Sequence, residues 1–335
     1  MKQQALRTIA TLSFLLMLTT TTAYAQSGLC GARNATLLAT GLEGATGSTV
    51  GPGGALYVTE GAAGRISRVD PQTREITTFA SGLPKSIIGI GGAIDVAFIG
   101  QTAYVLVTLV GSQFGGSDVV GIYRVDGPNS FTVVADIGEF NLHNPPTIPF
   151  PFFIPTGLQF ALETYRGGFL VTDGHLNRVL RVTLDGEVTV LIAFDDVVPT
   201  GLAVSGNTVY MAEAGPVPHL PQNGKVVSFG PKSSTAAEVA SGAPLLVDVE
   251  FGRGRSLYAL SQGDFLVGGD PGTPALPNTG SLVKVNGDGT FTIIMDGLDR
   301  PTSLEFIGDT AYVVTLTGEI WRIDGVLCPP FGVSR

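Results

Sequence analysis

The feature that most constrains the fold is a phrase that recurs along the 335-residue chain. "VPTGLAVSGNTVYMAEAG" begins at Val198; its first half returns as "IPTGLQF" at Ile154 and "RPTSLEF" at Arg300, and its second half as "ALYVTEG" at Ala55 and "GFLVTDG" at Gly167. Runs of Val, Ile, Thr, Tyr and Phe that are closed by Gly, Asp or Asn are typical of strands. The phrases return at intervals of about 40 to 65 residues, a spacing typical of propeller blades with insertions.

Each phrase divides into four strand-like pieces joined by turn residues. The second piece is found at residues 56–60, 103–107, 169–173, 209–213, 257–261 and 311–315. Between the third and fourth pieces lie "DPQTRE", "DGPNS", "LDGE" and "NGDGT", and Asp-Gly and Asn-Gly supply the positive φ of tight hairpins. Stretches with helical periodicity are scarce, so we predict an all-β chain with six blades.

The sixth phrase ends near residue 326 without a fourth strand. The missing piece is at the other end of the chain, because "ATLLATGL" at 35–42 resembles "ITTFASGL" at 76–83 and "FTIIMDGL" at 291–298. We therefore predict a six-bladed β-propeller closed by the N-terminal strand, which pairs with the last blade and leaves only short sheet edges. Tandem β-sandwiches are the alternative, and they do not explain the unpartnered strand.

The N-terminus has the three parts of a secretory signal peptide. Lys2 and Arg7 precede the apolar run "IATLSFLLML", and Ala23 and Ala25 form an Ala-x-Ala cleavage site. We predict a signal peptide at 1–25 and a propeller domain at 26–335, with export to a periplasm or to the outside of the cell. The apolar run is too short for a permanent membrane anchor. A buried N-terminal strand or helix is the alternative.

Cys30 and Cys328 are the two cysteines of the chain, and they lie near the two ends of the predicted propeller. In an oxidising compartment a disulfide between them is expected. Closing so long a loop stabilises a fold by about 5 kcal/mol in the chain-entropy model. Two unrelated free thiols are the alternative.

The charge of the chain limits its partners. The formal net charge is −9, and the chain has no run of Lys or Arg. Nucleic acids and anionic membrane surfaces are therefore not expected as partners. No later segment is apolar over the length that a membrane span needs. We expect a monomer that binds a small molecule or a protein.

The long irregular links of the predicted propeller all open on one face. They start at Pro84, Leu109, Gly138, Gly215 and Gln262, and the opposite face holds tight hairpins. One of them, "GEFNLHNPPTIPFPFFIP", is rich in Pro and Phe and predicts a stiff apolar loop. Loops on one rim of a rigid scaffold are where binding residues are usually found. The alternative is that insertions accumulated there without a function.

Carboxylates in the repeats form a candidate metal site. Glu60, Asp173 and Glu213 end second strands, whereas Asp95 and Asp248 lie in first strands of opposite blades. Carboxylate oxygens suit a hard divalent cation such as Ca²⁺ or Mg²⁺, which we place at the tunnel mouth. For Asp95 and Asp248 the alternative is hydrogen bonding to neighbouring backbone.

Further polar residues fall in the same rim. We predict a ligand-binding role for His143, His175, Asn177 and His219, with solvated loop residues as the alternative. A Gly-x-Ser-x-Gly elbow before a helix, which would indicate nucleophilic catalysis, is absent from the sequence.

The order of the phrases resembles the ScyD/ScyE family, named after scytonemin biosynthesis clusters. The segments that carry the resemblance are "GPGGALYVTEG", "GGAIDVAF", "GGFLVTDGHLNRVLRV", "VPTGLAVSGNTVYMAEAG", "LLVDVEFGRGRSLYAL" and "GSLVKVNGDGT", and Asp95 and Asp248 fall where that family has an Asp. The resemblance covers nearly the whole mature chain. It implies an exported six-bladed propeller of the NHL and TolB-like class whose biochemical role is poorly defined. Our first hypothesis is a binding or scaffold protein that engages its partner at the loop-rich rim.

A broader resemblance is to propellers of the gluconolactonase (SMP-30-like) type. Those hold a divalent metal at the tunnel mouth through Glu, Asn and Asp side chains, and Glu60, Asn177 and Asp173 are residues of these types on the same rim. This resemblance implies a metal-dependent lactonase, in which the cation polarises a carbonyl and activates water. Such a hydrolase is the alternative function.

Overall fold

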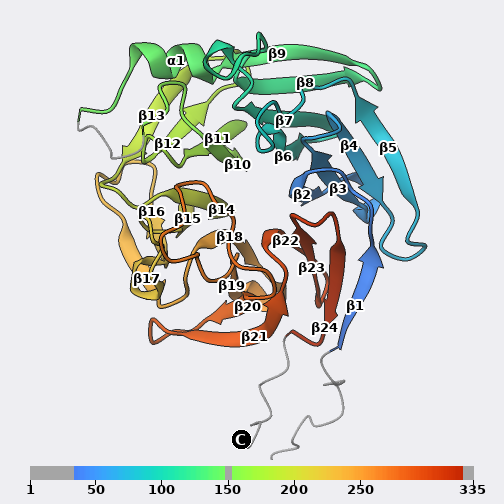
Figure 1. The fold of residues 1–335 in the computed structure, drawn as a ribbon, viewed down its shortest axis with the longest axis vertical. Coiled ribbons are helices and arrows are strands. Elements are labelled where there is room, and N and C mark those ends of the chain that lie inside the picture. The colour runs from blue at the N-terminus through green and yellow to red at the C-terminus, as the bar shows by residue number, and fades with distance from the viewer. Residues whose placement is uncertain (1–33, 148–152, 327–335) are drawn as a thin grey trace, which may run out of the picture. The chain divides into compact units, whose positions relative to one another are not determined.

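The computed structural model describes residues 34–147 and 153–326. Within this part of the chain, twenty-four strands form six four-stranded antiparallel sheets arranged around a central axis (Figure 1). The predicted signal peptide, Cys30 and Cys328 lie outside the described residues, so the signal peptide and the disulfide stay predictions. The all-β, six-bladed propeller is confirmed.

Each sheet is one blade, numbered here in chain order from the first complete one. Blade 1 comprises β2 (Ala45–Val50), β3 (Leu56–Glu60), β4 (Arg65–Val69) and β5 (Ile76–Ser81); blade 2 comprises β6 (Gly92–Ile99), β7 (Thr102–Thr108), β8 (Gly121–Gly127) and β9 (Ser130–Asp136); blade 3 comprises β10 (Gln159–Tyr165), β11 (Gly168–Asp173), β12 (Arg178–Val182) and β13 (Val188–Ala193). Blade 4 comprises β14 (Pro199–Ser205), β15 (Thr208–Glu213), β16 (Lys225–Phe229) and β17 (Ala237–Ser241); blade 5 comprises β18 (Leu246–Phe251), β19 (Leu257–Ser261), β20 (Gly280–Val285) and β21 (Phe291–Leu298). Blade 6 comprises β22 (Pro301–Ile307), β23 (Thr310–Thr315), β24 (Ile320–Asp324) and, from the start of the chain, β1 (Asn34–Ala39).

The ring closes as the sequence predicts. β1 is the outermost strand of blade 6 and pairs antiparallel with β24, with Asn34 opposite Asp324 and Leu37 opposite Trp321. The first described strand thus completes the blade that the last strands begin. The ring thus closes inside one sheet, in which β1 from the start of the domain joins β22, β23 and β24 from its end. Contact between the edges of two separate sheets is not needed.

The core consists of apolar layers between neighbouring blades. Six buried clusters, one for each pair of adjacent blades, line these contacts. In four of them a Tyr of a second strand meets a Phe of the next blade, with ring centroids 4.7 to 5.3 Å apart: Tyr57–Phe98, Tyr104–Phe169, Tyr210–Phe251 and Tyr258–Phe306. Aromatic pairs at such distances add to the burial energy of the rings. The recurring "LYV", "AYV", "VYM" and "LYA" therefore encode the joints between blades.

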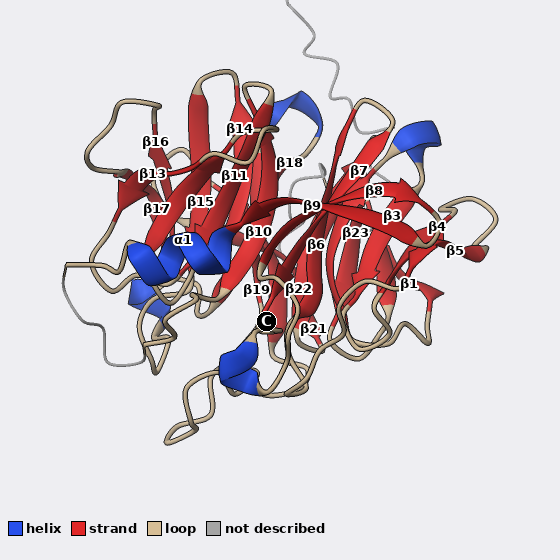
Figure 2. Cartoon of the chain, turned by 90° about the horizontal axis from the view of Figure 1, so that it is seen from above, coloured by secondary structure: helices blue, strands red, loops and turns tan. Residues whose placement is uncertain are grey.

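The two faces of the ring differ in their links. We call the face with the second-to-third strand links and the blade-to-blade links the loop face, and the other the plain face. Links 82–91, 109–120, 137–158, 214–224 and 262–279 are all on the loop face, whereas plain-face links are short. Figure 2 shows α1 and the longest loops at one end of the blades. The predicted segregation of long links is confirmed.

One of these links begins as a helix, which the sequence did not indicate. α1 (Ile137–His143) starts where a loop was expected, and the carboxylate of Asp136 caps it by accepting a hydrogen bond from the Glu139 N–H at 2.8 Å. Four 3₁₀ turns lie in other links: η1 (Pro52–Gly54), η2 (Ser112–Phe114), η3 (Pro221–Asn223) and η4 (Arg253–Arg255). Among the described residues no helix is long and apolar enough to cross a membrane.

Candidate functional site

Three of the predicted metal ligands lie opposite basic residues on the neighbouring strand of the same blade. Glu60, Asp173 and Glu213 are the last residues of second strands, and each lies opposite a basic residue that starts the third strand. The cross-strand pairs are Glu60–Arg65, Asp173–Arg178 and Glu213–Lys225. An acidic and a basic residue facing each other across two strands compensate each other's charge.

Glu60 has no oxygen left for a metal ion. It is fully buried, and Arg65 donates to both of its oxygens, at 2.8 and 2.7 Å. The Ser67 hydroxyl donates to Oε1 at 2.5 Å and the Glu43 N–H to Oε2 at 2.6 Å. Such a bidentate, charge-assisted pair fixes the turn between β3 and β4.

Asp173 fastens α1 to blade 3. Its Oδ2 accepts hydrogen bonds from Asn141 Nδ2 at 2.6 Å and Gln159 Nε2 at 3.1 Å, while its Oδ1 accepts from backbone N–H groups of Leu158 and Leu176. Arg178 donates to Asn141 Oδ1 at 2.8 Å, which closes the network. Burial raises the pKa of Asp173, while Arg178 and these hydrogen bonds act against that rise.

Glu213 is the least compensated of the three. It is buried, and the Lys225 ammonium opposite it donates to Glu238 at 2.7 Å instead. Burial raises the pKa of Glu213 to about 7, although the charge of Lys225 lowers it in part. Glu238, which shares Lys225 with it, raises this pKa further, and a pKa near 7 makes Glu213 sensitive to pH changes around neutrality.

Asp95 and Asp248 hold equivalent positions in opposite blades, and both accept hydrogen bonds from backbone N–H groups. Asp95 accepts the N–H of Val96 at 2.8 Å and that of Leu162, on the next blade, at 2.7 Å. Asp248 repeats both contacts with Val249 at 2.8 Å and Leu304, on the next blade, at 2.7 Å. Each carboxylate therefore joins the inner strands of two blades. The hydrogen-bonding alternative is the one that the geometry supports.

Glycine makes room for each of these carboxylates on the preceding blade. A Cβ on Gly47 would overlap Asp95, and a Cβ on Gly201 would overlap Asp248. Neither glycine has a positive φ, so the requirement is close approach. The unit of Gly, Asp and backbone N–H thus spans three consecutive blades and occurs twice, on opposite sides of the axis.

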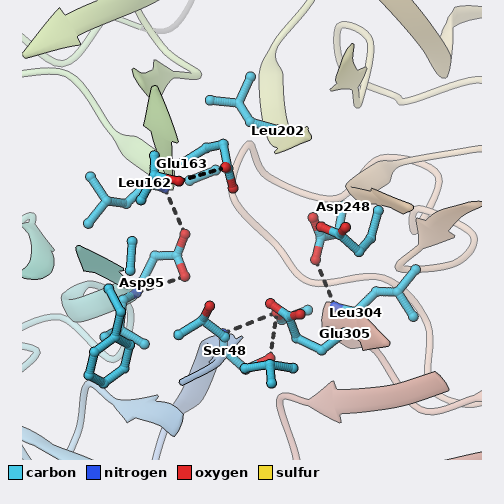
Figure 3. Close-up of a pocket in the computed structure, with 17 residues that line it drawn as sticks. Ser48, Asp95, Leu162, Glu163, Leu202, Asp248, Leu304 and Glu305 are labelled. Atoms are coloured by element: carbon cyan, nitrogen blue, oxygen red, sulfur yellow. Dashed lines mark hydrogen bonds between the residues drawn. The ribbon is translucent and has the colours of Figure 1, made fainter. Parts of the chain in front are cut away.

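The central tunnel contains an acidic cavity of about 290 Å³ (Figure 3). Five carboxyl groups line it, and no Lys, Arg or His is among the lining residues: the acids are Asp95, Glu163, Asp248, Glu250 and Glu305. Inner strands run from the loop face to the plain face. The lining residues come from the middle and the ends of these strands, so the cavity lies toward the plain face.

Burial raises the pKa values of these five carboxyl groups. Loss of contact with water raises the pKa of Glu163 and of Asp248 to about 7. The pKa values of Asp95, Glu250 and Glu305 are also raised well above their ordinary values, first by burial and then by repulsion from other carboxylates in the cavity. At neutral pH the cavity consequently holds protons as well as negative charge.

The three glutamates were not selected from the sequence, although the sequence held a signal for two of them. In "VDVEF" the residues Asp248 and Glu250 are two positions apart, so both face the same side of the strand. Glu305 in "SLEF" holds the position of Glu250 in the neighbouring repeat. Glu163 precedes Thr164 in "ALETY", a less similar stretch.

The five predicted metal ligands do not come together. Asp95 and Asp248 share the tunnel cavity, but Glu60, Asp173 and Glu213 lie at the loop-face ends of three different blades, each with its own partners. Within 34–147 and 153–326, no group of three or more His, Cys, Asp or Glu side chains is arranged to hold a metal ion. These residues do not fit the divalent cation that the sequence suggested.

The predicted rim ligands are divided between solvent and loop structure. His143 is exposed on α1, whereas His219 is buried and its Nδ1 lies 2.7 Å from the carbonyl oxygen of Gly215. Asn177 is buried, and its Oδ1 accepts the N–H groups of Val197 and Val198 at 2.9 and 2.8 Å. Burial lowers the pKa of His175 to about 4. Asn177 and His219 therefore shape the links rather than face a ligand.

The links of the loop face expose a set of large apolar side chains. Most of the exposed large hydrophobic residues outside the outermost strands are in its links: Ile87, Ile88, Ile90, Leu142, Phe153, Val217, Leu220, Leu266, Val267 and Leu276. The remainder, such as Ile293, are on the outermost strands of blades or in a short plain-face hairpin. Concentration of apolar surface on one face marks interaction sites.

Comparison with known proteins places the fold but not the function. No protein-family model matches the sequence, and no curated protein matches it, so the ScyD/ScyE resemblance stays a prediction. A gluconolactonase from Xanthomonas campestris superposes with a TM-score of 0.62 at 12% identity, over 88% of this chain and 90% of that one. The propeller architecture is shared.

Propellers with other functions superpose as well. A virginiamycin B lyase from Staphylococcus aureus gives a TM-score of 0.52 at 14% identity, over 87% of this chain and 98% of that one. A chain of a nidogen/laminin complex gives 0.52 at 15% identity, over 78% and 84%. At such identities the likeness shows the fold alone, because one propeller scaffold supports many functions.

Proposed function

We propose that this chain is an exported binding or scaffold protein that engages its partner through the loop face. The observation that supports the proposal most is the concentration of exposed apolar side chains in the long links of that face. A single exposed apolar residue needs no explanation, but a set concentrated in the links of one face does.

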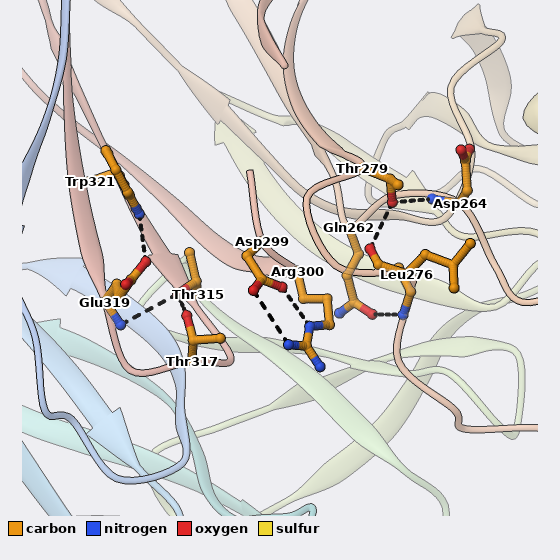
Figure 4. Close-up of polar contacts among 11 residues, drawn as sticks. Gln262, Asp264, Leu276, Thr279, Asp299, Arg300, Thr315, Thr317, Glu319 and Trp321 are labelled. Atoms are coloured by element: carbon orange, nitrogen blue, oxygen red, sulfur yellow. Dashed lines mark hydrogen bonds and ion pairs between the residues drawn. The ribbon is translucent and has the colours of Figure 1, made fainter. Parts of the chain in front are cut away.

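The links are held firmly enough to present a defined surface. Within link 262–279, Gln262 Oε1 accepts the N–H of Ala275 at 3.0 Å, and the hydroxyl of Thr279 accepts the Asp264 N–H at 2.9 Å (Figure 4). The same hydroxyl donates to the carbonyl of Leu276 at 2.8 Å. A surface that is ordered before binding loses less entropy on association.

The proposal can be tested by site-specific photo-cross-linking in the exported proteins of the source cells. A photoreactive residue is placed at Ile88 or Val267 on the loop face, and at Asn207 or Gly287 on the plain face as matched controls. We expect a discrete cross-linked partner from the loop-face positions alone. Equal cross-linking from both faces, or from neither, would contradict the proposal.

The alternative is a metal-dependent hydrolase of the lactonase type. Its support is the presence of gluconolactonases among the structural neighbours. The described carboxylates give it no ligand set, because Glu60 and Asp173 are saturated by hydrogen bonds and Asp95 and Asp248 bind backbone. Turnover in a lactone and ester screen, together with one equivalent of divalent metal by elemental analysis, would favour this alternative over binding.

A further inference from the structure

Four links of blades 3 to 5 form one consolidated unit on the loop face. Ala214, Leu245 and Ala275 are buried together and Val198 packs against them, which joins links 194–198, 214–224, 242–245 and 262–279. Above this small core, the rings of His219 and Phe265 meet edge to face with centroids 5.1 Å apart. The four links therefore act as one surface.

Exposed apolar side chains emerge directly from this contact. Leu220 follows His219 in sequence and Leu266 follows Phe265, so each leucine is the chain neighbour of one ring of the pair. Val217, Leu220, Leu266, Val267 and Leu276 have exposed fractions of 44%, 42%, 47%, 92% and 38%, and we call these five residues the blade 4–5 patch. Val267 is almost entirely in solvent.

The four links themselves carry negative charges only, while the nearest basic residues, Lys225 and Arg300, are paired with Glu238 and Asp299. Asp195, Asp196, Asp264 and Asp270 lie in the four links, which contain no Lys or Arg. Val198 packs against Ala214, Leu245 and Ala275, which places the aspartate link 194–198 against the other three links. An apolar centre with an acidic border complements a partner that combines apolar and positively charged side chains.

We propose that the blade 4–5 patch binds a basic, apolar polypeptide segment of another protein. This inference rests on the proposed binding function and specifies its partner. Apolar side chains of the segment cover Val267 and the leucines, while its Lys or Arg side chains face Asp264, Asp270 and the link at 194–198. A second copy of this chain fits less well, because its net charge is −9 and it would bring the same sign to the interface.

The test uses three synthetic peptides of equal length and fluorescence anisotropy with the whole propeller. One peptide alternates Lys with Leu, the second alternates Glu with Leu, and the third alternates Lys with Ser. We expect the Lys/Leu peptide to bind at least tenfold more tightly than either of the others. Its affinity should fall as salt is added, since surface charge attraction is screened.

Two variants locate the binding. The double change Leu266→Ser with Val267→Ser should weaken the Lys/Leu peptide at least tenfold, and Asp264→Asn with Asp270→Asn should reduce its salt dependence. The matched controls are Ile293→Ser, which removes an exposed apolar residue from β21 outside the patch, and Glu75→Gln on a plain-face hairpin. The controls should bind as the unaltered protein does.

Several results would overturn the proposal. These are equal binding of the Glu/Leu peptide, an unchanged affinity in the patch variants, or binding to vesicles of zwitterionic lipid that the Lys/Leu peptide does not displace. Should Ile88 cross-link a partner while Val267 does not and the peptides fail to bind, the loop-face function would stand and this inference alone would fail. Circular dichroism and melting temperature of each variant exclude unfolding as the cause.

Discussion

Replacing one tunnel carboxyl by its amide should stabilise this protein, and only at higher pH. The perturbation is Glu163→Gln. Glu163 faces the acidic cavity, its nearest hydrogen-bond partner is the Thr164 hydroxyl at 3.3 Å, and its pKa is raised from 4.5 to about 7 by burial. The amide keeps the shape of the side chain and removes its charge.

The magnitude follows from the pKa. A carboxyl whose pKa is higher in the folded state favours folding while it is protonated, and that contribution is lost as the pH rises from about 4.5 to about 7. At about 1.4 kcal/mol per unit of pKa the full effect is about 3 kcal/mol. Because Glu163 is half-buried and lines an open cavity, we expect about half of it: Glu163→Gln should gain about 1–2 kcal/mol more at pH 8 than at pH 5.

The assay is urea unfolding of the variant and the unaltered protein at both pH values. The quantity to compare is the difference in the free energy of unfolding between the two proteins. His175 and His219 have lowered pKa values, so between pH 5 and 6.5 their contribution to stability rises with pH while that of the tunnel carboxyls falls. Both proteins contain these histidines, so their contribution cancels in the difference. Glu75→Gln, at an exposed hairpin, should change neither value. An equal loss of stability at both pH values in Glu163→Gln would refute the reasoning.

Further predictions concern the joints between and within blades. Asp248→Asn and Asp95→Asn should each lower the free energy of unfolding by about 1–3 kcal/mol and by similar amounts, because each carboxyl accepts one N–H on each oxygen and an amide replaces one of these oxygens by an NH₂ donor; unequal losses would argue against the matching geometry. Arg65→Met should cost about 2–4 kcal/mol in urea unfolding, since it leaves a buried carboxylate uncompensated. Gly201→Ala should lower the melting temperature by several degrees, whereas Gly287→Ala, which meets nothing within 4 Å, should leave it unchanged.

The architecture was predictable because every blade repeats the same local chemistry. Asp-Gly and Asn-Gly turns, alternating apolar residues and an aromatic residue in each second strand, Tyr in five blades and Phe169 in blade 3, occur at similar positions in successive phrases. A misread strand in one phrase can therefore be recognised from the others. The closing strand was predictable for the same reason: residues 35–42 match fourth strands elsewhere, and β1 pairs with β24. Comparison of the repeats therefore identifies strands that the sequence of one strand alone would not identify.

The site was less predictable because its residues act through partners that the sequence does not place. Glu60 and Asp173 were interpreted as ligands from their position at a rim, but the arginines that begin the next strands, Arg65 and Arg178, face them once the hairpin register is fixed. Such a pairing was visible in principle, since an acidic residue precedes each arginine by five positions. The tunnel glutamates were missed although Asp95 and Asp248, also on inner strands, were selected, because the sequence does not show that strands of four different blades point their carboxyl groups into one cavity.

The position of the acidic cavity also bears on the choice between binding and hydrolysis. Its carboxyls lie toward the plain face, where short hairpins surround the axis, whereas the long links and exposed apolar residues are on the loop face. A reaction that used Glu163 or Glu305 would therefore draw its substrate past the plain face, and the loop face would contribute nothing to its specificity. Binding at the loop face, by contrast, leaves the tunnel carboxyls untouched. Glu163→Gln should accordingly change stability while leaving affinity at Val267 unaltered.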